Sequence, residues 1–149
     1  MDTNVSKRDP RYFIDTNVFL RALIRDDEKT FTDVMSFLER VKDNQLKAYT
    51  SSLVLAEVVW TLLSFYKLAK EDVLKSIDSI VSLRGLTFLS DQDVLTALSL
   101  YKKYNVKYVD CLIRASLDDR KTWAIVSYDK DFDKFDIERL EPSEFLKKS

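Results

Sequence analysis

The 149-residue chain is 46% hydrophobic and 33% charged, which is typical of one well-ordered globular domain. It has no histidine and a single cysteine, Cys111, which excludes a Ser-His-Asp triad, a Cys-His pair, imidazole metal ligands and an internal disulfide. The net charge of −1 gives no global sign of a polyanionic partner. No apolar stretch is long enough to span a bilayer, so we expect a cytoplasmic protein with no membrane partner.

Short apolar segments alternate with longer amphipathic ones, the pattern of an α/β domain. We expect strands at 11–14, 47–50, 86–89 and 122–127. We expect helices at 28–43, from Ser51 or Ser52 to about Lys67, at 70–84, from Ser90 and Asp93 onward, and from near Val109. Gly85, the only glycine, fits the left-handed position that closes a helix. Together these elements predict one doubly wound domain at 11–149 after a polar extension at 1–10.

Two acidic residues stand just beyond predicted strands. Asp15 follows the strand at 11–14 directly, and Asp129 lies two residues past the strand at 122–127. Functional sites in open parallel sheets form beyond the carboxyl ends of the strands, so both side chains are candidates for one site. The structural alternative is that each of them is a helix N-cap.

Two further acids lie within predicted helices. Glu57 interrupts the apolar segment 53–60 and has no basic residue three or four positions away, so it must be held neutral, meet a distant partner or bind a cation. Its structural alternative is a solvated helix edge. Asp110 lies in the first turn of its helix, and the spacing to Lys107 and Arg114 also fits a surface ion pair.

Considered jointly, the four acids predict a cation site, because carboxylates that share a site repel one another unless cations bind them. Oxygen ligands without histidine or cysteine suit Mg²⁺ or Mn²⁺. Such cations polarise a phosphodiester and make hydroxide available near neutral pH, which supplies a nucleophile to a protein without histidine. A metal-free interaction module, with the acids as caps and ion pairs, stays open as the alternative.

Four segments around these acids resemble, in order, the motifs of the PIN-domain family, especially the small VapC-like toxins of prokaryotic toxin–antitoxin pairs. The segments are FIDTNVFL at 13–20, SSLVLAEV at 51–58, YVDCLIRA at 108–115 and IVSYDKDF at 125–132. The resemblance extends from Tyr12 to about Phe145. It implies a PIN-like three-layer α/β/α domain with a central parallel sheet of four to five strands.

The resemblance also implies a metal-dependent endoribonuclease. Matching the motifs gives the catalytic and metal-binding roles to Asp15, Glu57, Asp110 and Asp129. Thr16 and Asn17 have supporting roles, Asn17 by holding the site through hydrogen bonds. Ser127 is expected to orient phosphate or water. Asp131 or Asp133 could share the role of Asp129, because both follow it within four residues.

The implied biological role is the toxin of a type II toxin–antitoxin system, a homodimer that also binds a VapB-like antitoxin. The helices contain more large apolar side chains than one small core needs, among them Phe19, Phe37, Trp60 and Phe65. Lysines and tyrosines interleave at 101–108, where they could bind RNA or form a solvated helix face. Action on DNA flaps or single strands stays open, because no residue recognisably reads a ribose 2′-hydroxyl.

Overall fold

Five parallel strands form one sheet in the computed structural model, which describes residues 9–90, 92–119 and 121–148. In chain order the strands are β1 (Arg11–Ile14), β2 (Lys47–Ser51), β3 (Leu86–Leu89), β4 (Trp123–Val126) and β5 (Glu138–Leu140). Their order across the sheet is β3-β2-β1-β4-β5, so β1 lies in the centre between β2 and β4. Because every neighbouring pair is parallel, the carboxyl ends of the strands lie along one edge of the sheet.

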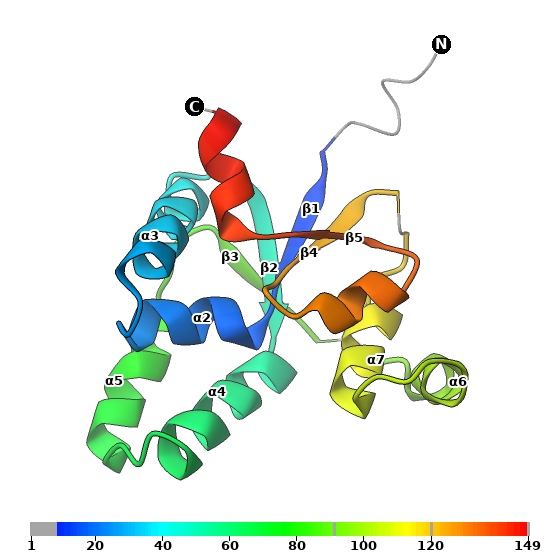
Figure 1. The fold of residues 1–149 in the computed structure, drawn as a ribbon, viewed down its shortest axis with the longest axis horizontal. Coiled ribbons are helices and arrows are strands. Elements are labelled where there is room, and N and C mark those ends of the chain that lie inside the picture. Colours follow the sequence, from blue (N-terminus) through cyan, green and yellow to red (C-terminus); the bar gives the residue numbers. More distant parts are fainter. Residues whose placement is uncertain (1–8, 91, 120, 149) are drawn as a thin grey trace.

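Helices connect the strands and lie on both sides of the sheet (Figure 1). They are α2 (Thr16–Leu23), α3 (Glu28–Lys42), α4 (Ser52–Ser64), α5 (Lys70–Val81), α6 (Val94–Lys103) and α7 (Tyr108–Ala115), with 3₁₀ helices η1 (Lys130–Lys134) and η2 (Pro142–Lys148). The pair α6 and α7 lies on the side of the sheet away from α3. Among the described helices none has the length and apolar character needed to cross a membrane.

The sheet buries aromatic side chains on both of its faces. On one face Tyr12 packs edge-on against Phe145 of η2, with 5.1 Å between the ring centroids, and Phe145 packs against Phe37 of α3 at 4.7 Å. On the other face Trp123 of β4 packs against Tyr49 of β2 at 5.0 Å. A parallel sheet must be covered on both faces because its strands are apolar on both. The expected three-layer α/β/α architecture is therefore confirmed.

The four predicted strands are confirmed to within one residue at each end. The predicted helices at 28–43 and 70–84 are confirmed as α3 and α5, although α5 ends at Val81. Helices after Asp15 and Asp129 were considered only through the N-cap alternative and are present as α2 and η1, whereas η2 and β5 were not anticipated. The strand β5 has only three residues, too few to show an alternating pattern, and two of them are charged. Of the expected polar extension at 1–10, residues 1–8 lie outside the described part of the chain.

Two helix ends differ from the sequence-based expectation. Helix α4 ends at Ser64 rather than near Lys67, and Lys67 itself adopts a left-handed backbone with φ of 58°. Helix α6 is capped by Asp93 alone, whose carboxylate accepts a 3.1 Å hydrogen bond from the Thr96 amide. The helix expected from Ser90 and Asp93 onward therefore begins after Asp93, and the sequence-based expectation that Ser90 opens it was wrong.

The left-handed conformation expected of Gly85 is confirmed, with φ of 91°. Gly85 lies directly before β3 rather than at the end of α5, whose C-cap is Ser82. A Cβ atom here would come within 2.1 Å of the Val41 carbonyl oxygen at the end of α3. The position therefore requires glycine both for its backbone angle and for this close approach.

Candidate active site

Asp15 begins the site at the carboxyl end of β1, where it is 5% exposed. Its Oδ2 accepts hydrogen bonds from the Ser127 hydroxyl at 2.8 Å and from Nδ2 of Asn17 at 3.2 Å. Burial raises the pKa of the Asp15 carboxyl to about 6, and the Ser127 hydrogen bond opposes that rise. Although Asp15 occupies the N-cap position of α2, its side chain forms no capping hydrogen bond. The N-cap alternative therefore does not account for this carboxylate.

Ser127 and Asn17 tie the ends of β1 and β4 together. The Ser127 hydroxyl donates to Asp15 and accepts from Nδ2 of Asn17 at 3.1 Å and from the Asp129 amide at 2.9 Å. Oδ1 of Asn17 accepts from the Tyr128 amide at 3.0 Å. Asn17 therefore makes hydrogen bonds to Asp15, Ser127 and Tyr128, and its supporting role stays a prediction. The expectation that Ser127 contacts phosphate or water is wrong, because its side chain is fully buried and its hydrogen-bonding capacity is used within the protein.

Glu57 reaches the same edge from α4. Its Oε1 accepts a 2.7 Å hydrogen bond from the hydroxyl of Thr16, the first residue of α2. The residue is half-buried rather than at a fully solvated helix edge. The negative charges of Glu57 and Asp129 raise the pKa of Asp15 further, after the larger effect of burial. Glu57 is therefore an electrostatic neighbour of Asp15 although 42 positions separate them in the sequence.

Asp110, in the first turn of α7, is 3% exposed. Among the described residues none makes a hydrogen bond to its Oδ2 atom. Burial raises the pKa of the Asp110 carboxyl to about 7, with Lys107 opposing the rise and the nearby carboxylates of Asp15, Asp129 and Glu57 adding to it. The surface ion pair considered for Asp110 is wrong, because the side chain is buried and, within the described part of the chain, one of its oxygens lacks a donor.

Three carboxylates converge at one point of this edge. Asp110, Asp129 and Asp131 each offer an oxygen atom, and these atoms lie within 4.8 Å of one another. Asp129 also caps η1, since its Oδ1 accepts from the Asp131 amide at 2.9 Å, so capping and membership of the cluster coexist. Asp133 instead pairs with Arg139 at 2.9 Å. Of the two residues that could share the role of Asp129, Asp131 is therefore the one whose carboxylate lies beside it.

Two lysines border this group of three acids, which we call the acidic triplet. Nζ of Lys107 lies 3.8 Å from Oδ2 of Asp129, and Nζ of Lys134 lies 3.5 Å from Oδ1 of Asp131. Lys134 also donates to the carbonyl oxygen of Asn105 at 3.0 Å, which ties η1 to the loop between α6 and α7. Asp15 and Glu57 lie beside the triplet, so within the described residues the negative charge of this region exceeds the positive charge.

Arg139, on β5, is the site-supporting residue that the sequence did not reveal. Its side chain is 12% exposed. The guanidinium donates to the Ser127 carbonyl at 3.0 Å, to Glu141 at 2.8 Å and to Asp133 at 2.9 Å. It therefore joins the end of β4 to η1 and to β5. No local sequence signal could have shown this role, because it depends on a strand too short to recognise.

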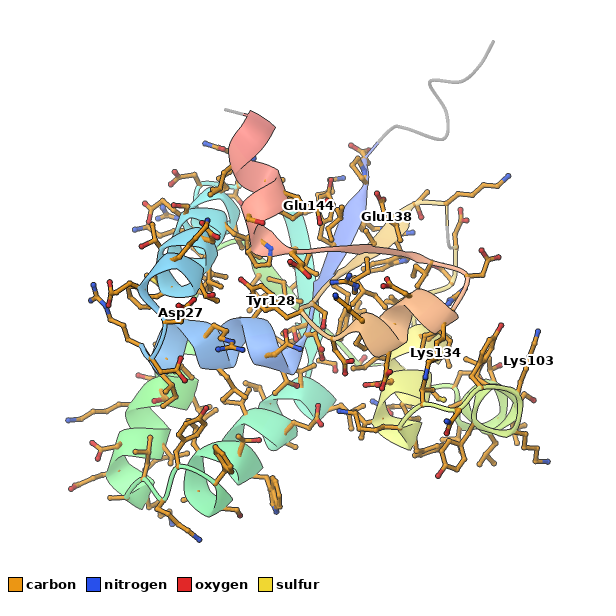
Figure 2. All side chains as sticks on the ribbon, viewed as in Figure 1. Asp27, Lys103, Tyr128, Lys134, Glu138 and Glu144 are labelled. Carbon is orange, nitrogen blue, oxygen red and sulfur yellow. The ribbon has the colours of Figure 1, made fainter. Side chains whose placement is uncertain are left out.

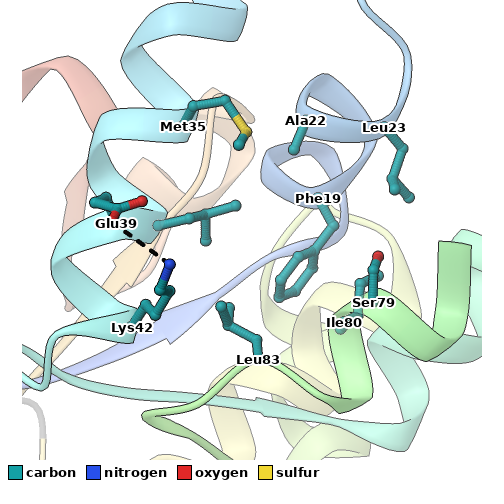
Figure 3. A pocket seen from close by; sticks show the side chains of 10 residues that line it. Phe19, Ala22, Leu23, Met35, Glu39, Lys42, Ser79, Ile80 and Leu83 are labelled. Atoms are coloured by element: carbon teal, nitrogen blue, oxygen red, sulfur yellow. Dashed lines mark ion pairs between the residues drawn. The ribbon is translucent and has the colours of Figure 1, made fainter.

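An apolar cavity lies elsewhere, between α2, α3 and α5 (Figure 3). Its volume is about 290 Å³, and side chains such as Phe19, Leu23 and Met35 line it. Glu39 and Lys42 form a 3.7 Å ion pair at its wall. None of the carboxylates of the triplet lines this cavity. The chemistry available at the sheet edge is thus spatially separate from the apolar cavity.

The fold and the site define a small parallel α/β domain with an acidic centre at the carboxyl edge of its sheet. The profile of the PIN domain family matches residues 12–138, so the chain belongs to that family. The chain is 25% identical over 131 residues to a VapC ribonuclease from Aquifex aeolicus (strain VF5), covering 88% of this chain and 96% of that protein.

A solved structure also matches over most of its length. This is the crystal structure of VapBC2 from Rickettsia felis bound to a DNA fragment from their promoter. The TM-score is 0.62 and the identity 19%, over 88% of this chain and 98% of that chain. The PIN-like fold expected from the four motifs is thereby confirmed.

Proposed function

We propose that this protein is a divalent-cation-dependent endoribonuclease that hydrolyses RNA phosphodiester bonds with Mg²⁺ or Mn²⁺. The observation that carries the proposal is the buried Oδ2 of Asp110, which has no hydrogen-bond partner among the described residues and belongs to the acidic triplet. Buried polar atoms are normally paired, so an unpaired carboxylate oxygen beside two more carboxylates calls for a cation.

The donor set fits a hard divalent cation. Asp110, Asp129 and Asp131 offer carboxylate oxygens whose spacing within 4.8 Å lets one ion contact all three. Carboxylates suit Mg²⁺ and Mn²⁺, whereas zinc sites usually include cysteine or histidine. A chain without histidine has no imidazole for such a site. We assign the first contacts with the cation to this triplet, with Asp15 and Glu57 completing the acidic centre.

In this mechanism a bound divalent cation supplies Lewis-acid polarisation of the phosphodiester and lowers the pKa of water. The protein holds the carboxylates that position it. Thr16 orients Glu57 through its hydroxyl, and Ser127 orients Asp15 while fixing the Asp129 amide. Asn17 holds this arrangement across the two strand ends. The catalytic contribution of each carboxylate is therefore to place charge where the phosphate reacts.

RNA as the substrate rests on the similarity to a VapC ribonuclease. The same similarity, together with the VapBC2 structure, supports a toxin role in a type II toxin–antitoxin pair with a VapB-like antitoxin. Exposed apolar side chains on α4, at its C-cap and on α5 offer a surface for such a partner or for a second copy, with Trp60 67%, Phe65 71% and Leu74 59% exposed. Phe19 and Phe37, also considered as surface residues, are instead buried in the core.

The proposal is tested by incubating purified protein with single-stranded RNA and with DNA of the same sequence, in Mg²⁺, in Mn²⁺ and in EDTA. We expect internal cuts in RNA that require the cation. Asp110→Asn should abolish cleavage, and Asp78→Asn, which changes an exposed acid on α5, should not. RNA cleavage that persists after thorough chelation would contradict the mechanism. Cleavage of DNA but not of RNA would support the alternative that the protein acts on DNA. Cleavage of neither nucleic acid would favour a catalytically silent interaction module.

The proposed self-association is tested separately. Light scattering at micromolar concentration should report a homodimer, and the dimer or antitoxin surface should include the exposed side chains of α4 and α5. Trp60→Ser with Phe65→Ser should weaken association without changing the melting temperature by more than a few degrees, because both side chains are largely exposed. A strictly monomeric parent protein would contradict the homodimer.

A further inference from the structure

Lys107 carries a positive charge at the mouth of the acidic triplet. It is the N-cap residue of α7, and its carbonyl accepts the Asp110 amide at 3.1 Å and the Cys111 amide at 3.3 Å. Its backbone is therefore fixed by the first turn of the helix that carries Asp110. The side chain, by contrast, is 63% exposed. The backbone of Lys107 is thus held in place, whereas the side chain that carries the ammonium group is flexible.

The contact of Lys107 with the triplet is weak. Nζ lies 3.8 Å from Oδ2 of Asp129, which is beyond hydrogen-bond length, and an ion pair this exposed contributes little. The other oxygen of Asp129 accepts from the Asp131 amide. Lys107 therefore faces the oxygen of Asp129 that does not cap η1. A cation entering the triplet would bring its positive charge beside Asp129 and repel the ammonium group.

Lys134 provides the contrast. Its ammonium group is anchored on the Asn105 carbonyl at 3.0 Å in addition to Asp131 at 3.5 Å, so it is held between η1 and the start of α7 (Figure 2). For Lys107, the described structure gives a single ion pair and no hydrogen bond from Nζ. Of the two lysines beside the triplet, Lys107 is therefore the one free to change partner.

We propose that Lys107 is a substrate-binding residue that leaves Asp129 when a divalent cation occupies the triplet and then binds a phosphate of the RNA backbone. The inference rests on the proposed function and adds to it a specific contact between protein and RNA. The charge of the incoming cation displaces the ammonium group, and the substrate brings a negative phosphate to the same place. Lysine binds phosphate as a flexible point charge, which suits a side chain that must exchange partners.

The first measurement concerns the cation alone and needs no catalysis. The stabilisation of the protein against heating is titrated with Mg²⁺ for the parent, Lys107→Met and Lys103→Met. Lys103, on α6 (Figure 2), is the control from the same lysine-rich segment: its side chain is exposed and its Nζ lies over the Tyr104 ring, which fits the solvated helix face, so we assign it no contact with RNA. Removing the competing ammonium should tighten the apparent dissociation constant by up to about fivefold in Lys107→Met. Lys103→Met should match the parent.

The second measurement is the affinity for a fluorescent single-stranded RNA of mixed sequence, in Ca²⁺ to suppress cleavage, over a range of salt concentrations. Loss of one phosphate contact should lower the slope of log affinity against log salt by about 0.7 in Lys107→Met. Lys107→Arg should retain the parent slope, because the positive charge remains. Lys103→Met should retain it as well.

The two measurements together decide the proposal. An unchanged salt slope in Lys107→Met would overturn it, even if Mg²⁺ binding tightens, since Lys107 would then only balance charge. Equal loss of slope in Lys107→Met and Lys103→Met would also overturn it, because the effect would be one of overall charge. Failure of the parent itself to respond to Mg²⁺ or to bind RNA would instead contradict the proposed function, so the two failures are distinguishable.

Discussion

The hydroxyl of Thr16 donates a 2.7 Å hydrogen bond to Oε1 of Glu57, and this contact joins α2 to α4 at the acidic centre. We expect Thr16→Val to leave the fold intact and to weaken Mg²⁺ binding roughly tenfold, the lower end of the cost of removing a group that orients a metal ligand. Thr16→Ser should restore it, since it keeps the hydroxyl. The measurement is the Mg²⁺ dependence of the melting temperature. Equal Mg²⁺ responses in valine and serine variants would show that this hydrogen bond has no positioning role.

Glu57→Gln distinguishes a cation ligand from a structural acid. In EDTA the variant should melt at or above the parent, because it lacks one of several mutually repelling carboxylates. In saturating Mg²⁺ it should lose much of the parent's gain in stability, and RNA cleavage should fall by roughly two orders of magnitude or more. A structural salt bridge would instead cost about 3–5 kcal/mol with or without Mg²⁺. A cation-independent loss of stability with cleavage retained would remove Glu57 from the site.

The stability of the cation-free protein should fall as the pH rises from about 4 to about 7. The pKa of Asp110 is raised to about 7 and that of Asp15 to about 6, from the ordinary value of 3.8. At pH values between 3.8 and these raised pKa values, the folded state binds more protons than the unfolded state. Stability therefore decreases as the pH rises, until the pH passes the pKa of the folded state. No histidine titrates in this window, because the chain has none.

The measurement is the melting temperature in EDTA across this pH range, for the parent and Asp110→Asn. Each kcal/mol of lost stability should lower the melting temperature by roughly 2–4 °C. Asp110→Asn should flatten the upper part of the profile, near pH 7. Mg²⁺ should bind more tightly as the pH rises through that region, since protons and the cation compete for the same carboxylates. A parent profile that rises with pH would show that burial does not hold protons on these acids.

Arg139 should contribute to both stability and cation binding. Arg139→Met leaves the Ser127 carbonyl and two carboxylates without their donor, which we expect to cost about 1–3 kcal/mol. Because Ser127 hydrogen-bonds Asp15 and the Asp129 amide, the variant should also bind Mg²⁺ more weakly. Arg139→Lys should recover part of the stability, as a single ammonium reaches fewer partners. Urea unfolding and Mg²⁺ titration of both variants test this, and a stable variant with normal Mg²⁺ binding would contradict it.

Gly85→Ala should lower the stability of the fold without changing cation binding at the acidic centre. The φ of 91° and the 2.1 Å approach of a new Cβ to the Val41 oxygen predict a loss of several kcal/mol, because both the backbone angle and the packing must change. The position is far from the acidic triplet in the chain and on the opposite side of β2 from β1 and β4. Mg²⁺ affinity of the folded fraction should thus be unchanged. A melting temperature equal to that of the parent would refute the packing argument.

The sequence alone predicted which residues lie close together where the local pattern of strands and helices also determines the topology. Asp15 and Asp129 follow recognisable strands, and parallel strands bring such residues to one edge, so their proximity was predictable. Glu57 was a candidate site residue because no basic residue lies three or four positions from it in its helix. The burial of Ser127, the choice of Asp131 over Asp133 and the position of Arg139 were not predictable. They depend on how η1 turns and how β5 pairs, which are properties of tertiary structure rather than of local spacing.

The hydrogen bond between Ser127 and Asp15 joins residues 112 positions apart. During synthesis, a nascent chain that stops before Trp123 lacks β4 and Ser127, which leaves β1 as an edge strand and Asp15 without its Ser127 donor. Contacts of such long range form only after most of the polypeptide is available. A translation product truncated before Trp123 therefore cannot contain the assembled acidic centre. Whatever chemistry the centre performs is confined to chains that have been translated through Asp131.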